Sequence, residues 1–211
     1  RLDALDAVRT RPGGYLVVEK ILGAGETLPA AWPVAGTTGY DFMNEVSALQ
    51  HLEGAERALG ELWHRVSGRP PDFATEERAA RADILDRAFG GQFEAVVEAV
   101  LQADDPSREE ALFTMPALRR CLRALLVGYD VYRPYPEAPP DGGALEALSR
   151  AVDRAREALA PGDRWLLDRI AAWFRVPTAA HAPALTRFAQ LSAPIAARAV
   201  EDTAFYRYGR L

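Results

Sequence analysis

The sequence predicts a mostly α-helical protein with a few short strands, and three observations lead to this fold class. Apolar residues recur at helical spacing through most of the middle of the chain. Runs typical of strands are few and short, and segments rich in proline and glycine separate the helical stretches. A chain of 211 residues is long enough to bury a hydrophobic core.

Four stretches carry the three- and four-residue apolar spacing of an amphipathic helix. They lie at 59–66, 93–101, 145–159 and 166–174. Pro161 and Gly162 break the pattern after the third stretch, and Asp163 then suits the N-cap of the next helix. We expect these apolar stripes to form the core rather than a cofactor site, with loops at 67–73, 103–109 and 132–143 between the helices.

The strand signals lie at 15–19, at 129–133 and, as a third possibility, at 194–202. Either three such short strands pair with one another, or their neighbouring strands belong to a part of the protein outside this chain. The chain starts at Arg1 rather than at Met and stops in "FYRYGRL". We therefore expect it to be a piece of a longer protein.

Composition excludes several classes of function. The net charge of −5 and the pI of about 5.3 argue against nucleic acid as a partner. No apolar run approaches the roughly 20 residues of a membrane span, and no signal peptide is visible. Cys121 has no second cysteine for an internal disulfide, which predicts a cytoplasmic protein. The three histidines are His51, His64 and His181, and they lack metal-ligand spacing among themselves or with Cys121. We therefore expect neither a metal nor an organic cofactor.

Glu19 directly follows the apolar run of the first predicted strand. Carboxylates are rare in strands and costly to bury unpaired, yet barrel enzymes place catalytic groups at the carboxyl ends of their strands. Partial burial would raise the pKa of Glu19 and suit it to act as a general acid. Alternatively, Glu19 marks the exit of the strand into solvent and pairs with Lys20.

Two further stretches are candidates for ligand binding. "GTTGYDF", at 36–42, offers backbone amides and hydroxyls to a polar ligand, or it is a tight turn into a helix capped by Thr37 or Thr38. "AVEDTAFYRY", at 199–208, places aromatic rings beside carboxylates and an arginine, as sugar sites do. Its alternative interpretation is the start of an amphipathic helix, with Asp202 as a favourable charge near the N-terminus.

Taken together, "VVEKILGAGETLP", "WPVAGTTGYDF" and "RAVEDTAFYRY" resemble the maltooligosyltrehalose synthases, members of the α-amylase-type barrel glycosidases. "YDVYRPY" is similar to a tyrosine-rich strand and loop of the same family. The matches lie in the family's order and extend from near residue 14 to the C-terminus. The resemblance implies partial (β/α)8 barrel segments at 1–45 and 176–211, which flank a helical insertion at 46–175.

The resemblance also implies a reaction, an intramolecular transglycosylation. The reducing-end α-1,4 bond of a maltooligosaccharide is cleaved, and the released glucose is rejoined through an α,α-1,1 bond. Such a retaining mechanism uses a nucleophilic Asp, an acid/base Glu and a further Asp. By position Glu19 matches the acid/base, and Asp202 matches the further Asp, although Glu201 stands where related glycosidases often have His.

The nucleophile of the family is expected upstream of Arg1. Asp3 and Asp6 superficially resemble its motif, but the His and Gly of that motif are missing, and Asp3 lies too close to Glu19 for an intervening crossover helix. Residues 1–9 are instead expected to end a helix. We therefore expect the chain to be inactive alone.

Four further residues are candidates for contact with the oligosaccharide: Tyr40, Arg198, Tyr206 and Arg207. The alternative role of each is packing or surface charge. Two other functions stay open. One is an α-glucan hydrolase of the same barrel family, in which water takes the place of the turned glucose. The other is a helical interaction module without catalysis. No nucleic acid or membrane partner is expected.

Overall fold

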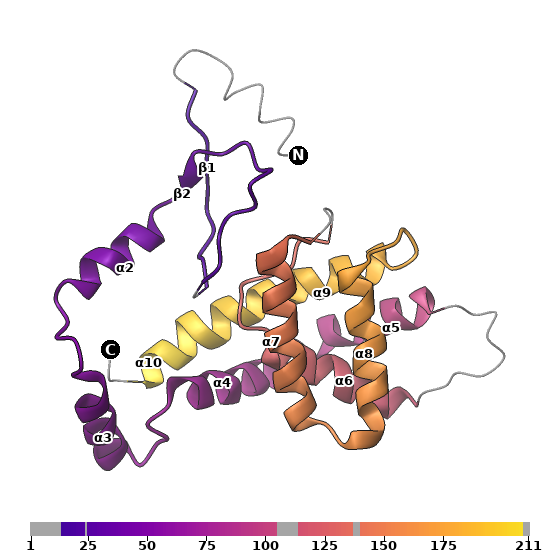
Figure 1. Ribbon diagram of the computed structural model, residues 1–211. Coiled ribbons are helices and arrows are strands. Elements are labelled where there is room, and N and C mark those ends of the chain that lie inside the picture. Colours follow the sequence, from indigo (N-terminus) through magenta and orange to yellow (C-terminus); the bar gives the residue numbers. More distant parts are fainter. Residues whose placement is uncertain (1–13, 24, 105–113, 137–139, 209–211) are drawn as a thin grey trace. The chain divides into compact units, whose positions relative to one another are not determined.

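The computed structural model describes residues 14–23, 25–104, 114–136 and 140–208, and it divides into two compact units, 1–59 and 60–211 (Figure 1). The described residues are mostly helical with two short strands, which confirms the fold class in its general form. The boundaries expected at 45 and 175 stay a prediction. The proposed helix at 1–9, with Asp3 and Asp6, lies outside the described residues.

The first unit contains two short parallel strands, β1 (Val17–Val18) and β2 (Gly36–Thr37), paired with Val17 opposite Gly36 and Val18 opposite Thr37. The strand predicted at 15–19 is thus confirmed at its centre, although both valines are half-buried. Its partner β2 was not predicted. Because the strands are parallel, their carboxyl ends lie at the same edge of the pair.

Helix α2 (Tyr40–Ala48) follows β2 after a tight turn at Gly39. Gly39 is the N-cap and has a φ of 99°, a conformation that favours glycine. The helix cap expected at Thr37 or Thr38 is therefore wrong. Thr37 braces the turn instead: its hydroxyl donates to Asp41 at 2.5 Å and accepts from the Gly39 N–H at 3.1 Å. The Thr37 hydrogen bond also lowers the pKa of Asp41.

The second unit is a helical bundle, and the boundary between the units falls within its first helix. Its elements in chain order are α3 (Glu56–Ser67), α4 (Phe73–Ala88), α5 (Gly90–Ala103), α6 (Met115–Gly128), α7 (Gly142–Ala158), the 3-10 turn η1 (Pro161–Asp163), α8 (Arg164–Arg175), α9 (Ala182–Ile195), η2 (Ala196–Ala204) and α10 (Phe205–Arg207).

Helix α6 lies at the centre of this bundle. Helices α7 and α8 pack against α6, while α9 and η2 lie across α4, and α9 also packs on α5 (Figure 1). The stripes predicted in 93–101, 145–159 and 166–174 supply buried core residues, as expected. The stripe at 59–66 does not, because Leu59, Leu62 and Val66 are 43%, 45% and 77% exposed.

Side-chain oxygens cap several of these helices. Asp72 accepts hydrogen bonds from the backbone N–H groups of Ala74 and Thr75 at the start of α4, as an N-cap does. Asp163 occupies the N-cap position of α8, as predicted, but its side chain makes no capping bond. It forms an ion pair with Arg120 of α6 instead, at 2.7 Å.

Two of the three predicted strands are wrong. The segment 129–133 is not a strand; it connects α6 to α7 and has no strand beside it among the described residues. Tyr129 is buried there because its ring packs edge-on against Phe188. The segment 194–202 is helical: it covers the end of α9 and most of η2, whose buried alanines pack against α4. Tertiary packing overrides the local strand signal in both cases.

Candidate functional site

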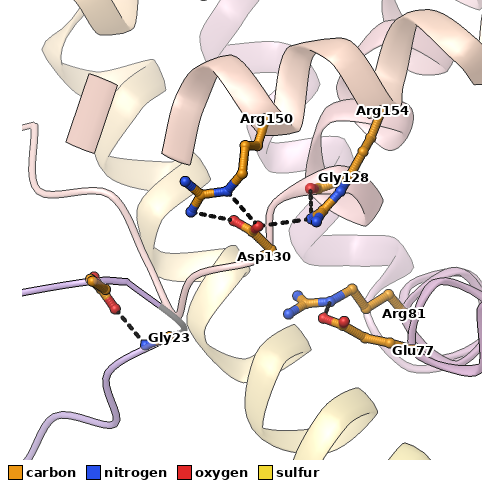
Figure 2. Close-up of polar contacts among 8 residues, drawn as sticks. Gly23, Glu77, Arg81, Gly128, Asp130, Arg150 and Arg154 are labelled. Atoms are coloured by element: carbon orange, nitrogen blue, oxygen red, sulfur yellow. Dashed lines mark hydrogen bonds and ion pairs between the residues drawn. The ribbon is translucent and has the colours of Figure 1, made fainter. Parts of the chain in front are cut away.

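Glu19 lies at the carboxyl end of β1, and its side chain is exposed. Successive side chains of an extended chain point to opposite sides, and Lys20 is correspondingly buried. The Lys20 ammonium pairs with Glu26 at 2.7 Å. Glu26 also accepts the backbone N–H of Gly23 at 2.9 Å, a contact drawn in Figure 2. These two contacts fix the loop that follows Glu19.

This geometry corrects one expectation for Glu19 and agrees with part of its alternative. Partial burial was expected, but the side chain is exposed in the part of the chain that the structure describes. The exposure agrees with the alternative that Glu19 marks the exit of the strand into solvent, although Lys20 forms its ion pair with Glu26. The carboxylate of Glu19 is therefore accessible to a ligand from outside the first unit.

The turn after β2 lies at the same edge of the strand pair as Glu19. The register places Thr37 opposite Val18, and the Thr38 N–H donates to the Val18 carbonyl at 3.1 Å. The residues next in line, Glu19 and the start of α2 at Tyr40, thus leave the strand pair at one end. Two motifs that are separate in the sequence are brought together here.

The predicted site residues near the C-terminus lie on one continuous helix formed by α9, η2 and α10. Its middle section η2, Ala196–Ala204, is a π-helix. On the exposed surface of η2, Arg198 pairs with Asp202 at 3.1 Å, and both side chains are more than half exposed. The Thr203 hydroxyl donates to the Arg198 carbonyl at 2.7 Å.

An aromatic cluster anchors the end of this helix. Tyr208 is buried, donates its hydroxyl to the Pro71 carbonyl at 2.5 Å, and packs edge-on against Trp63 and Phe73. Two residues before Tyr208, Tyr206 is 85% exposed. Arg207 extends toward Asp83 of α4, 3.6 Å away.

The six predicted site residues thus fall in two groups. Glu19 and Tyr40 belong to the first unit, at the shared end of β1 and β2. The other four belong to the second unit: Arg198, Asp202, Tyr206 and Arg207. Of these four, the structure brings Arg198 and Asp202 into contact.

The segment "YDVYRPY" is held by an ion-pair cluster that the sequence analysis missed. Asp130 lies between Arg150 and Arg154 of α7, at 2.8 Å and 3.0 Å (Figure 2). Arg154 also donates to the Gly128 carbonyl at 3.3 Å. The two arginines are four residues apart on one helix face, and that spacing was the available signal. The cluster holds the residues directly after α6 against α7.

Glu201 is half-buried beside Asp202 on η2. Burial raises the pKa of Glu201, and the neighbouring Asp202 carboxylate raises it further. The folded state therefore binds this proton more tightly than the unfolded state does. Consequently the contribution of Glu201 to stability falls as the pH rises through the unfolded pKa toward the folded one.

Replacing Glu201 by glutamine should remove this pH-dependent loss. At each pH we take the melting temperature of Glu201→Gln minus that of the unmodified chain. We expect this difference to be more positive at pH 7 than at pH 4. Thermal melts at the two pH values measure the difference. Glu98→Gln, at an exposed position of α5, is the control and should show no such change. An equal offset at both pH values for Glu201→Gln would contradict the expectation.

Among the described residues, no group of three or more His, Cys, Asp or Glu side chains is arranged to hold a metal ion. Burial raises the pKa of the Cys121 thiol to about 11, which makes a reactive thiolate at neutral pH unfavourable. No helix in the described ranges combines the length and apolar character of a membrane span.

Comparison with known proteins gives the same family name from sequence and from structure. No family model matches the chain. A Mycobacterium tuberculosis protein provisionally named maltooligosyl trehalose synthase is 30% identical over 95% of this chain and 24% of its own length. The maltooligosyltrehalose synthase structure from Arthrobacter ramosus superposes with a TM-score of 0.78 at 28% identity, over 99% of this chain and 25% of that one.

A glycosyltrehalose synthase structure has a TM-score of 0.66 at 23% identity, over the whole of this chain and 24% of that one, which supports the fold alone. The chain spans about a quarter of the length of each of these proteins. The chain is thus similar, over almost its whole length, to about one quarter of a maltooligosyltrehalose synthase.

Proposed function

We propose that this chain is part of a maltooligosyltrehalose synthase and that Glu19 is its general acid/base. One observation carries the proposal. An accessible glutamate follows a strand of a parallel pair, at the edge from which the neighbouring strand also leads into its helix. Enzymes built on parallel strands place their reacting groups at this edge. The similarity to synthases over nearly the whole chain supports the assignment.

The proposed reaction has two steps. An Asp carboxylate outside this chain attacks C1 of the penultimate glucose, while Glu19 protonates O4 of the reducing-end glucose, so that the α-1,4 bond breaks. The freed glucose turns within the site. Glu19, now a carboxylate, takes the proton of its anomeric hydroxyl, and that oxygen attacks C1 of the covalent intermediate. The α,α-1,1 bond forms and the Asp leaves, without net oxidation or reduction.

The remaining site residues are proposed to complete the carbohydrate site. Asp202 supplies the further carboxylate, which stabilises charge in the transition state. Its ion pair with the exposed Arg198 supports a polar surface that can bind sugar hydroxyls. The exposed ring of Tyr206 supports stacking on an apolar sugar face. Tyr40 and Arg207 are further proposed contacts.

We extend the proposal to the architecture of the longer protein. Residues 1–45 and 176–211 are proposed as parts of a (β/α)8 barrel, and 46–175 as a helical insertion. The two-residue parallel strands support this, because parallel pairs of that length require neighbouring strands and cover on both faces. The isolated chain would then lack both the nucleophile and most of the barrel.

Product analysis tests the proposed function. The longer protein is incubated with maltopentaose, and the products are followed by loss of reducing ends and by NMR of the anomeric protons. We expect a non-reducing product with an α,α-1,1 linkage. Glucose and shorter maltooligosaccharides alone would indicate the hydrolase, and unchanged maltopentaose would favour the interaction module. The 211-residue chain should give no product, and turnover by that chain would contradict the expected dependence on residues outside it.

A further inference from the structure

We propose that Thr203 is a positioning residue. Its hydroxyl fixes a widened π turn that keeps the Arg198–Asp202 pair on the exposed face of the helix, where the pair can bind the oligosaccharide. The inference rests on the proposed function, because it concerns the same carbohydrate site. It gives Thr203, a residue of the "VEDTAFYRY" motif, a role of its own and identifies the π turn as the structural device.

The spacing of buried residues from η2 to Tyr208, directly after α10, carries the argument. Ala196, Ala199, Ala204 and Tyr208 are 4%, 0%, 0% and 1% exposed. The intervals between them are three, five and four residues. An α-helix with 3.6 residues per turn returns to the same face after three or four residues. The five-residue interval between Ala199 and Ala204 is therefore one residue too long, as expected for a π turn.

The extra residue decides which side chain lies against α4. In an uninterrupted α-helix, Asp202 or Thr203 would occupy the buried position that follows Ala199. The π turn places Ala204 there instead. As a result the side chains of Asp202 and Arg198 remain 56% and 68% exposed and form their ion pair in solvent. Burying Asp202 without a partner would be costly.

Thr203 supplies a contact that suits the widened turn. Its hydroxyl donates to the carbonyl of Arg198, five residues earlier, at 2.7 Å. The ladder is already interrupted upstream, because Pro194 lies inside α9 and has no N–H to donate. The Thr203 side chain therefore reinforces the turn on which both members of the ion pair are presented.

Packing alone does not require this arrangement. The residues of η2 that face α4 are alanines, and an ordinary α-helix can present alanines at three- and four-residue spacing equally well. π turns are rare and occur frequently at functional sites. The backbone at the "VEDTAFYRY" motif adopts a π-helical conformation in place of the usual α-helix. A local conformation this uncommon supports the inference of a functional role.

The test compares Thr203→Val with Thr203→Ser in the longer protein. We expect Thr203→Val to lower kcat/KM for maltopentaose about tenfold, because a small displacement of positioned groups is costly in rate. Thr203→Ser keeps the hydroxyl and should restore kcat/KM to near the unmodified value. Thr75→Val removes another helix hydroxyl, which donates to Asp72 at 2.7 Å; it should leave kcat/KM unchanged even where it lowers the melting temperature.

The outcomes separate the positioning role from the proposed function. Unmodified protein that makes no trehalosyl product overturns both. Active protein whose Thr203→Val variant has normal kcat/KM overturns the positioning role alone, whatever happens to its melting temperature. Should Thr203→Val fail to fold, Thr203→Ala is compared with Thr203→Ser. Equal kcat/KM for those two also overturns the role, and a defect confined to Thr203→Ala supports it.

Discussion

The Glu19→Gln variant of the longer protein should lose about 10²- to 10⁴-fold in kcat for maltooligosaccharide conversion, the usual contribution of a general acid/base. Glutamine keeps the size of the side chain but can neither donate nor accept the proton at the glycosidic oxygen. Glu19 is exposed at the end of β1, so the substitution disturbs no described packing. We therefore expect the loss to appear in kcat while the melting temperature stays unchanged.

Separate measurement of kcat and KM distinguishes a chemical role from a binding role. Because Glu19 is proposed to act on the glycosidic bond itself, its loss should lower kcat, whereas loss of a contact made equally with substrate and transition state would raise KM at an unchanged kcat. Glu45→Gln, at an exposed position of α2, is the matched control and should keep both kcat and KM. A Glu19→Gln variant within tenfold of the unmodified kcat would remove Glu19 from the chemistry.

The Gly128→Ala variant should lower the free energy of unfolding by about 1–3 kcal/mol, as overpacking of a tight contact does. Gly128 ends α6 where that helix meets α7. An added Cβ would lie 2.9 Å from the Ala151 carbonyl oxygen and 3.3 Å from the Arg154 Cβ. The first of these is a backbone atom that cannot rotate away, so the helices must separate. Arg154 would also lose its contact with the Gly128 carbonyl.

Gly91 provides the control, because an added Cβ there meets no atom within 4 Å. Gly91→Ala lies in the first turn of α5 and should raise stability by about 0.4–1 kcal/mol, chiefly by reducing the freedom of the unfolded chain. Urea unfolding of the two variants gives the comparison. Equal effects of the two substitutions would contradict the close approach of α6 and α7.

Periodic apolar patterns predicted helices well where one face packs against the bundle. Val96, Val97 and Val100 of α5 and Leu166 and Leu167 of α8 are buried as expected. The same pattern at 59–66 correctly predicted the helix α3 but not its place in the core, because Leu62 and Val66 are exposed. Periodicity reports that a helix has an apolar face. It does not report which surface covers that face.

The failed strand predictions have identifiable physical causes. In 129–133, aromatic and β-branched residues are buried between helices, and Asp130 is held by arginines of α7 rather than by a neighbouring strand. In 194–202, Pro194 and the five-residue interval of the π turn disrupt the helical period. A pattern search based on 3.6 residues per turn cannot follow such an interval. The short strand β2 has too few residues to give a pattern.

The candidate site was predictable in part. Glu19 was identified because a carboxylate after an apolar run is unusual, and its position at the end of β1 agrees with that reasoning. The pairing of Arg198 with Asp202 was not predicted, because it depends on a helical four-residue spacing that crosses from a possible strand at 194–202 into a possible helix start at 199–208. The role of Thr37 in bracing the turn before α2 likewise depends on the backbone conformation of Gly39.

A crystal structure of the longer protein with a bound maltooligosaccharide tests the central claim most directly. We predict a Glu19 carboxyl oxygen within about 3 Å of the reducing-end glycosidic oxygen, the reach of a general acid. The Asp202 carboxyl should lie within about 10 Å of that of Glu19, a separation at which carboxyl groups flank one glycosidic bond. An oligosaccharide bound away from Glu19, with the two carboxyl groups on separate surfaces, would contradict the account.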